Sequence, residues 1–327
     1  MTSTQIPLHT DFDSATTATG VLDGCDLSGM TAVITGGYSG LGLEAARALA
    51  NVGVSVVVPA RDVAKAKAAL RGIEQIELAP LDLMDPASID AFAQQFLASG
   101  RPLHILLNAA GIMAAPLRRD SRGYESQFST NHLGHFQLTA RLWPALLRAN
   151  GARVVSVSSL GHRLSPVDFD DPNFDRRPYD KWIAYGQSKT ANALFAVGAD
   201  GLGEAEGIRA FSLHPGSIFT PLSRHLDIDD YRRVGAADAD GNLLSTEQAG
   251  FKTVEQGAAT LVWCATSHQL DGMGGVYCED CDIAPLAVSE NEKAGVRPWA
   301  VDPELARRLW TMSEQLTGVR FPAGQHA

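Results

Sequence analysis

Short apolar runs alternate along this chain with longer stretches whose apolar residues recur at helical spacing. The runs are rich in β-branched residues and apolar at nearly every position, as expected of parallel strands that are covered on both faces. They occupy residues 31–35, 54–58, 76–81, 103–108, 153–159, 209–214 and 274–279. Helices are expected at residues 40–51, 62–71, 86–98, 124–149, 180–201 and 253–267. This order predicts a single doubly wound α/β domain, with about seven parallel strands and helices on both faces of the sheet.

Several segments fall outside this alternation, around a main domain at 30–290. Residues 1–29 precede the first strand and are expected to form a partly ordered arm with a short helix. Residues 160–183 are rich in Pro and Asp, and residues 221–250 are polar with several glycines, so both are expected to be loops. The tail, 291–327, is expected to be a helical extension, and its helix is expected to begin at the pair Asp302-Pro303.

Composition excludes several classes of protein. The 327 residues carry a formal net charge of −10 and scattered basic residues, which argues against a nucleic-acid-binding surface. The N-terminal residues resemble neither a signal nor a transit peptide, and no run is long enough to span a membrane. Cys25 and Cys264 are isolated, so no disulfide framework is expected. These features together predict a cytoplasmic protein.

A metal centre is not predicted. Cys278 and Cys281 form the sequence CEDC, a spacing shared by zinc and redox sites, but no second such pair accompanies it. We therefore expect two unpaired thiols there. The histidines near the predicted strand ends lack a metal-ligand spacing, and His135 is expected to be a packing residue. These histidines are His132, His135, His162 and His214.

The segment TGGYSGLG, residues 35–42, lies between the first strand and the first helix. A glycine-rich turn at this place can hold the pyrophosphate of a dinucleotide, because free N–H groups and the helix dipole attract the anion and glycine permits close approach. Glycines in such a turn also serve simply to make it tight. The segment by itself leaves both interpretations open.

Further motifs resemble those of the short-chain dehydrogenase/reductase family. The turn has the family's TGxxxGxG spacing, with Gly36, Gly40 and Gly42 after Thr35. Matching stretches follow in the family's order over about residues 28–285: LNAAG (with Leu107 for the usual Asn), STNHLGHF, VVSVSSLG, YGQSK and HPGSIFT. Within the family, the chain is most similar to the branch of retinol dehydrogenases and WW-domain oxidoreductases. The resemblance implies a Rossmann-type catalytic domain and an oxidoreductase activity.

Tyr185 and Lys189 supply the predicted chemistry. They are four residues apart on a predicted helix, so they share one face, and a nearby ammonium group favours the ionised phenol. A Tyr and Lys at this spacing can also be an ordinary surface pair, but the preceding strand ends in hydroxyl residues, which favours a site. We assign Tyr185 as general acid/base. The resemblance implies that Ser159 hydrogen-bonds the substrate oxygen, with Ser158 a structural neighbour, and that Asn131 places a proton-relaying water near Lys189.

The resemblance also implies the residues that contact a coenzyme. Asp82 is expected near the adenine amino group, although it equally suits the start of the helix at Pro86. The full set of expected contacts is Gly36, Tyr38, Ser39, Gly40, Leu41, Gly42, Arg61, Asp82, Leu83, Asn108, Ala109, Ala110, Gly111, Tyr185, Lys189, Pro215, Gly216, Ile218 and Thr220.

The end of the second strand favours NADP(H) over NAD(H), although NAD(H) stays possible. Ala60 stands where the family's NAD-selective acid usually lies, and Arg61 follows it. A guanidinium without a competing acid suits the 2′-phosphate of NADP. Asp62 could pair with Arg61, and the glycine-rich turn carries Tyr38 and Ser39 where many NADP enzymes of the family have a base.

We therefore predict interconversion of an alcohol and its aldehyde or ketone. The branch suggests a rather lipophilic substrate, selected by the loops 160–183 and 221–250. Tyr179 and Trp182 are candidate pocket walls, or packing residues of the loop. An NAD-dependent dehydrogenase of a catabolic alcohol and a non-catalytic dinucleotide-binding redox sensor are the alternatives. The resemblance implies a homodimer or homotetramer formed through the helices at 124–149 and 180–201.

Overall fold

The fold is built on one eight-stranded sheet. We describe residues 4–289, 292 and 294–322 of a computed structural model. The strands follow the order β3-β2-β1-β4-β5-β6-β7-β8, and all neighbouring pairs except β7 and β8 are parallel. Their bounds are Thr31–Thr35 (β1), Ser55–Ala60 (β2), Ile76–Pro80 (β3), Ile105–Asn108 (β4), Ala152–Val157 (β5), Ile208–His214 (β6), Val276–Glu279 (β7) and Asp282–Ile283 (β8). The seven strands and the doubly wound Rossmann-type fold predicted from the sequence are confirmed.

The sequence did not predict β8, because the turn that connects it to β7 contains no glycine to mark it. β7 and β8 form an antiparallel hairpin whose connecting residues, Asp280 and Cys281, have φ of +50° and +57°. Two consecutive residues of positive φ make the turn that matches the twist of a hairpin, and glycine or asparagine usually fills it. The sequence CEDC is therefore a hairpin turn.

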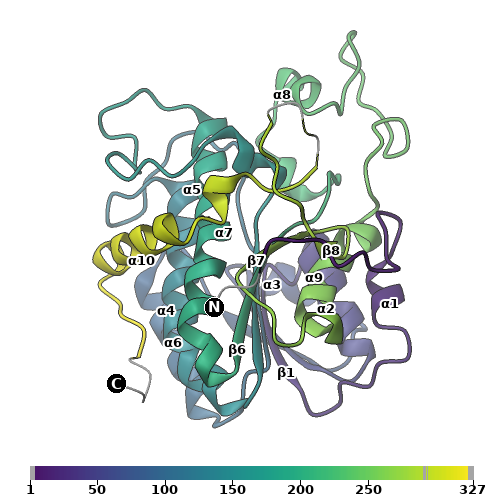
Figure 1. The fold of residues 1–327 in the computed structure, drawn as a ribbon, viewed down its shortest axis with the longest axis vertical. Coiled ribbons are helices and arrows are strands. Elements are labelled where there is room, and N and C mark those ends of the chain that lie inside the picture. The colour runs from purple at the N-terminus through teal and green to yellow at the C-terminus, as the bar shows by residue number, and fades with distance from the viewer. Residues whose placement is uncertain (1–3, 290–291, 293, 323–327) are drawn as a thin grey trace.

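Helices cover both faces of the sheet (Figure 1). One apolar core joins the sheet to α1, α2 and α9, and a second joins its other face to α4, α6 and α7. The helix bounds are Ala18–Val21 (α1), Gly40–Asn51 (α2), Val63–Ala69 (α3), Pro86–Ala98 (α4), Ser126–Phe128 (α5), Gly134–Arg148 (α6), Lys181–Gly203 (α7), Ile228–Arg233 (α8), Val254–Thr266 (α9) and Pro303–Thr317 (α10). Neighbouring residues set the starts of two helices. Asp85 caps α4 and Asp302 caps α10, and a proline follows each cap.

The two ends of the chain pack against the domain. The Gln5 side chain donates to the backbone oxygens of Tyr277 and Ala284 and accepts from the Tyr277 N–H, so the arm covers the β7 edge. At the other end α10 packs across α7 (Figure 1), and Trp310 stacks on Phe195 with ring centroids 5.9 Å apart. Among the described residues, no helix is long and apolar enough to cross a membrane.

Candidate active site

The glycine-rich turn is shaped by the protein's own backbone. A Cβ on Gly42 would lie 2.5 Å from the carbonyl oxygen of Gly36, and one on Gly36 would lie 3.0 Å from the Cα of Ala110. Gly40 has a φ of +52°, and a Cβ on it would lie 3.3 Å from the Cβ of Thr220. The turn is thus pressed between α2, the end of β4 and the segment after β6, and larger residues are excluded there.

This turn also fits an anion. Ser39 precedes α2 with an extended backbone, its side chain makes no capping hydrogen bond, and the first turn of α2 holds no acidic residue. The positive end of α2 therefore lacks a capping side chain. Oδ1 of Asp82 accepts from the Met84 N–H at 2.9 Å, and the cap of the following helix is Asp85; the expected contact of Asp82 with adenine stays a prediction. An anion such as a pyrophosphate would fit at such a helix start.

Thr35 joins three segments of the site and was missed as a functional residue. Its Oγ1 accepts from the backbone N–H groups of Ala109 (2.9 Å) and Ala110 (3.1 Å) and lies 2.9 Å from His135 Nε2. His135 Nδ1 is 2.9 Å from the carbonyl oxygen of Asn131. Burial, partly offset by that carbonyl, lowers the pKa of His135 to about 4, so the ring is neutral. His135 is a buried connector, which adds hydrogen bonds to the packing role that we expected.

Asn131 lies in a π-helical turn, Ser129–Leu133, where the sequence predicted a continuous helix. Its Oδ1 accepts from the Ile112 N–H at 2.9 Å, and its Nδ2 donates to the Ile112 oxygen and to Ser188 Oγ. π-Turns occur mostly as single insertions at functional sites. After it, α6 starts at Gly134, where a Cβ would lie 2.4 Å from the backbone oxygen of Leu83. The turn therefore ties the ends of β3 and β4 to α7.

Ser158 and Ser159 point in different directions at the end of β5. Ser158 donates to the backbone oxygen of Lys189 at 2.7 Å and is buried. Ser159 hydrogen-bonds the Tyr185 hydroxyl, and its Oγ also accepts from the Gly161 N–H at 3.0 Å. Gly161 is needed because a Cβ there would lie 2.7 Å from the Tyr185 ring. Ser159 thus faces the tyrosine, while Ser158 fastens strand to helix.

The backbone carbonyl oxygen of Ser159 accepts hydrogen bonds from two aromatic side chains. His162 Nδ1 lies 2.7 Å from it, and Tyr277 donates its hydroxyl to it at 3.2 Å. The other nitrogen of His162, Nε2, accepts from the backbone N–H of Arg297, which fixes the ring as the tautomer protonated on Nδ1. A residue near the C-terminus therefore helps to orient the end of β5.

Tyr185 and Lys189 share the inner face of α7, as predicted. Lys189 Nζ donates to the Val157 oxygen at 2.9 Å and lies 5.7 Å from the centroid of the Tyr185 ring. The expected acidification of the phenol is wrong for the protein itself. Burial raises the pKa of Tyr185 to about 12, and the Ser159 hydrogen bond opposes that rise only in part. Burial also lowers the pKa of Lys189 to about 8, which weakens its charge as an electrostatic partner.

A cluster of apolar side chains borders the tyrosine. Ala114, Trp182 and Tyr185 form a buried cluster, with Met113 and Leu226 packed against it. The Trp182 and Tyr185 rings meet edge to face, with centroids 6.3 Å apart. Trp182 therefore packs beside the tyrosine, and its expected role as a pocket wall stays a prediction.

Tyr179 takes the other alternative and is a packing residue of the loop. Its hydroxyl donates to the Ala115 oxygen at 2.8 Å and lies 3.2 Å from Glu125 Oε1. Burial raises the pKa of that carboxyl group, although backbone N–H groups at the start of α5 oppose the rise. Burial, together with the nearby Glu125 carboxyl group, likewise raises the pKa of Tyr179. These contacts fasten the 160–183 loop to α5.

The coenzyme contacts expected after β4 and β6 stay a prediction, and the structure places them at the carboxyl ends of these two strands. Asn108 is 1 % exposed, and its side chain donates to Thr139 in the interior. Ala109, Ala110 and Gly111 are half-buried beyond it. After β6, Gly216 has a φ of +94°, and its neighbour Ser217 accepts from the Lys252 N–H. The segment that follows carries Ile218 and Thr220 against α9 and the glycine-rich turn, as the distances to Gly257 and Gly40 record.

Arg61 follows β2, beyond the buried Ala60. The alternative partner considered for it, Asp62, instead caps α3 by accepting from the Lys65 N–H at 2.9 Å. Within the described part of the chain, no carboxylate lies within 4.0 Å of the Arg61 guanidinium. The acid that could neutralise Arg61 is thus engaged elsewhere.

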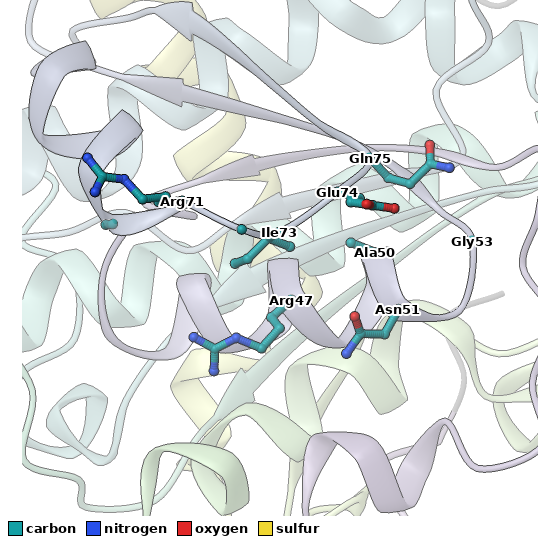
Figure 2. A pocket seen from close by; sticks show the side chains of 10 residues that line it. Arg47, Ala50, Asn51, Gly53, Arg71, Ile73, Glu74 and Gln75 are labelled. Atoms are coloured by element: carbon teal, nitrogen blue, oxygen red, sulfur yellow. The ribbon is translucent and has the colours of Figure 1, made fainter.

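The open hollow drawn in Figure 2 lies away from these residues. It has a volume of about 650 Å³ and sits at the amino ends of β2 and β3, beside the end of α2. Residues expected in the site are absent from its lining. Metal-binding clusters of three or more His, Cys, Asp or Glu are absent from the described residues. Cys278 and Cys281 are buried free thiols, as expected, and burial raises the pKa of Cys281 to about 12.

Known proteins share both the sequence and the fold. A short chain dehydrogenase family model matches residues 30–230. A probable oxidoreductase of Streptomyces lividans is 46% identical over 292 residues, which cover 87% of this chain and 96% of that protein. Human retinol dehydrogenase 12 is 35% identical over 305 residues, covering 90% and 88%. The crystal structure of an uncharacterised protein from Mycobacterium paratuberculosis superposes with a TM-score of 0.70 at 33% identity, covering 92% and 98%.

A doubly wound, mostly parallel sheet with a glycine-rich turn, a half-buried Ser159 and the buried pair Tyr185 and Lys189 near its carboxyl end is typical of a Rossmann-type oxidoreductase. The chain belongs to the short-chain dehydrogenase/reductase family, near its retinol dehydrogenase branch.

Proposed function

We propose that this protein interconverts an alcohol and its aldehyde or ketone, with Tyr185 as general acid/base and a nicotinamide coenzyme over the glycine-rich turn. The observation that carries the proposal is the meeting of Ser159, Tyr185 and Lys189 beside a cluster of apolar side chains. A bound nicotinamide coenzyme supplies or accepts the hydride. The chain's own residues have to hold the substrate oxygen and move its proton.

The proton steps follow from the contacts. Ser159 Oγ accepts from the Gly161 N–H, so its own proton can turn from the Tyr185 oxygen to a substrate oxygen when one binds. The Tyr185 hydroxyl keeps its proton at neutral pH, because burial raises its pKa, and it can therefore act as the acid in carbonyl reduction. Lys189, with a pKa lowered to about 8, can return a proton to the tyrosine. Gly111 leaves space between Asn131 and Lys189 for a relay, since a Cβ on it would lie 3.1 Å from Asn131 Oδ1 and 3.7 Å from Lys189 Nζ.

NADP(H) is the proposed coenzyme. The exposed Arg61 follows Ala60 at the end of β2, and the neighbouring Asp62 carboxylate is used to cap α3. This leaves Arg61 available to a 2′-phosphate, and no acid at residue 60 repels that group. The apolar residues beside Tyr185 favour a lipophilic substrate, chosen by the loops 160–183 and 221–250 of the catalytic domain 30–290.

A carbonyl screen with NADPH and NADH at equal concentration tests this proposal. We expect NADPH oxidation with lipophilic aldehydes or ketones and slower oxidation of NADH. Equal or faster turnover with NADH would favour an NAD-dependent dehydrogenase. Binding of NADPH without oxidation across a broad panel would favour a redox sensor.

A further inference from the structure

Two arginines from distant parts of the chain lie beside the glycine-rich turn. Arg61 follows β2, and Arg224 follows the 3₁₀ turn Pro221–Ser223 in the 221–250 loop. Arg61 and Tyr38 of the glycine-rich turn both lie close enough to Arg224 to influence its charge electrostatically. Arg224 was not among the residues expected from the sequence, because nothing local distinguishes it from other loop arginines.

The backbone explains how Arg224 reaches this place. Thr220 packs against Gly40, where an added Cβ would lie 3.3 Å from the threonine Cβ. The Thr220 side chain then caps the Pro221–Ser223 turn by accepting from the Leu222 N–H. Arg224 Nη1 donates to the Pro221 oxygen at 3.2 Å, so its side chain folds back over that turn. The contact between Thr220 and Gly40 therefore brings the segment that carries Arg224 close to the glycine-rich turn.

The two charges repel each other. Partial withdrawal from water, together with the charge of Arg61, lowers the pKa of Arg224. In the portion of the chain that the structure describes, neither guanidinium has a carboxylate within 4.0 Å. The net charge of the protein is −10, so acidic residues are plentiful elsewhere. Two cations kept together without a counter-ion create a local positive potential that an anion would stabilise.

We propose that Arg224 is a second ligand of the 2′-phosphate of NADP(H), facing Arg61 across the phosphate. The inference rests on the coenzyme assigned above. Tyr38 and Ser39 stand where many relatives carry a base within the glycine-rich turn, and Arg224 supplies the corresponding charge from the substrate loop. α8 begins at Ile228, shortly after Arg224. A 2′-phosphate held by Arg224 therefore also fixes the start of the α8 part of the 221–250 loop.

Direct binding of NADPH and NADH to the purified protein, followed by coenzyme fluorescence, tests the role of Arg224. We expect Arg224→Ala to weaken NADPH about tenfold and NADH less than about twofold, because one charge-assisted hydrogen bond is lost. Competition by 2′,5′-ADP should weaken in parallel, whereas competition by 5′-AMP should not. Competition by inorganic phosphate as strong as that by 2′,5′-ADP would instead indicate a general anion site and overturn the proposal.

A matched control is Arg232→Ala. It removes one positive charge from the same loop, but Arg232 is paired with Asp229 on α8. The ratio of the NADPH and NADH dissociation constants should stay at its wild-type value. Equal effects of the two substitutions would overturn the assignment of Arg224. Without coenzyme, Arg224→Ala should melt within about 2 °C of wild type, since it removes a repulsion, and a larger fall would indicate a structural role.

Arg61→Ala separates this inference from the proposed coenzyme. If wild type binds NADPH more tightly, and Arg61→Ala but not Arg224→Ala removes that preference, only the role of Arg224 is refuted. If wild type binds NADH as tightly as NADPH, the coenzyme preference fails and the role of Arg224 fails with it.

Discussion

Tyr185 illustrates the competition between burial and charge at a single residue. Its ring is 3 % exposed and packs on Gly161 and Trp182, so ionisation in that position is costly. The neighbouring Lys189 ammonium is itself buried, and its pKa falls to about 8. The protein alone therefore keeps the phenol protonated, and the positive charge of an oxidised nicotinamide would be needed to favour the phenolate in the oxidative direction.

Replacement of this phenol gives the sharpest prediction at the residue scale. Tyr185→Phe should lower kcat by more than about 100-fold, because the acid/base group is lost, while the dissociation constant of the coenzyme stays nearly unchanged. Tyr179→Phe is the control, since its hydroxyl bonds to Glu125 and Ala115 instead of facing the pocket. We expect Tyr179→Phe to cost about 1–2 kcal/mol of stability with kcat within a few-fold. Near-wild-type turnover of Tyr185→Phe would remove the tyrosine from the mechanism.

At the scale of elements, side-chain contacts hold α8 against the start of α7, and we call these contacts the latch. Asp230 is buried and accepts from Trp182 Nε1 at 2.8 Å and from Lys181. Arg233 of the same helix lies over the Trp182 ring, 5.3 Å from its centroid. Figure 1 shows α8 in the light-green segment at the top of the view, above the labelled elements of the sheet. The Asp230 carboxylate therefore holds the 221–250 loop against Trp182.

Weakening this latch should affect substrate binding more than chemistry. Asp230→Asn keeps the size of the side chain but removes the charge that Lys181 meets, which we expect to cost about 1–2 kcal/mol of loop closure. KM for a lipophilic substrate should then rise about tenfold, with kcat changed less than about threefold. Asp229→Asn is the control, because Asp229 pairs with Arg232 on the solvent side of α8. Steady-state kinetics that show the same KM for both variants would contradict the latch.

At the scale of the whole molecule, the C-terminal helix occupies the surface through which family resemblance implied association. Trp310 of α10 packs on α7 so closely that a Cβ on Gly198 would lie 2.7 Å from its ring. The same indole meets Phe136 of α6, with ring centroids 5.0 Å apart. A second copy of the chain could pair along α6 and α7 only if α10 moved away.

We therefore expect a monomer instead of the dimer or tetramer that the resemblance implied. Light scattering coupled to size-exclusion chromatography should give a mass near 34.8 kDa at micromolar concentration. Trp310→Ala should destabilise the protein by less than the about 3–5 kcal/mol of a fully buried ring, because a half-buried ring is lost from the α6–α7 surface. A wild-type mass of two or four chains would mean that association uses another face or displaces α10.

The sequence by itself determined whatever depends on neighbours along the chain. Apolar runs set seven strands, Asp-Pro pairs set the starts of α4 and α10, and a four-residue spacing placed Tyr185 and Lys189 on one face of a helix. The glycine-rich turn was also visible, although the reason for Gly42, contact with the Gly36 oxygen, was not.

Only the tertiary structure decided what depends on residues far apart in sequence. It bonded Thr35 to His135, set Arg224 beside Arg61, and joined Asp230 to Trp182. It also decided the pKa of Tyr185, because burial is a property of everything that packs around a side chain. Periodicity and capping act within a few residues and leave a mark in the sequence, whereas contacts across the fold leave none that a single chain displays.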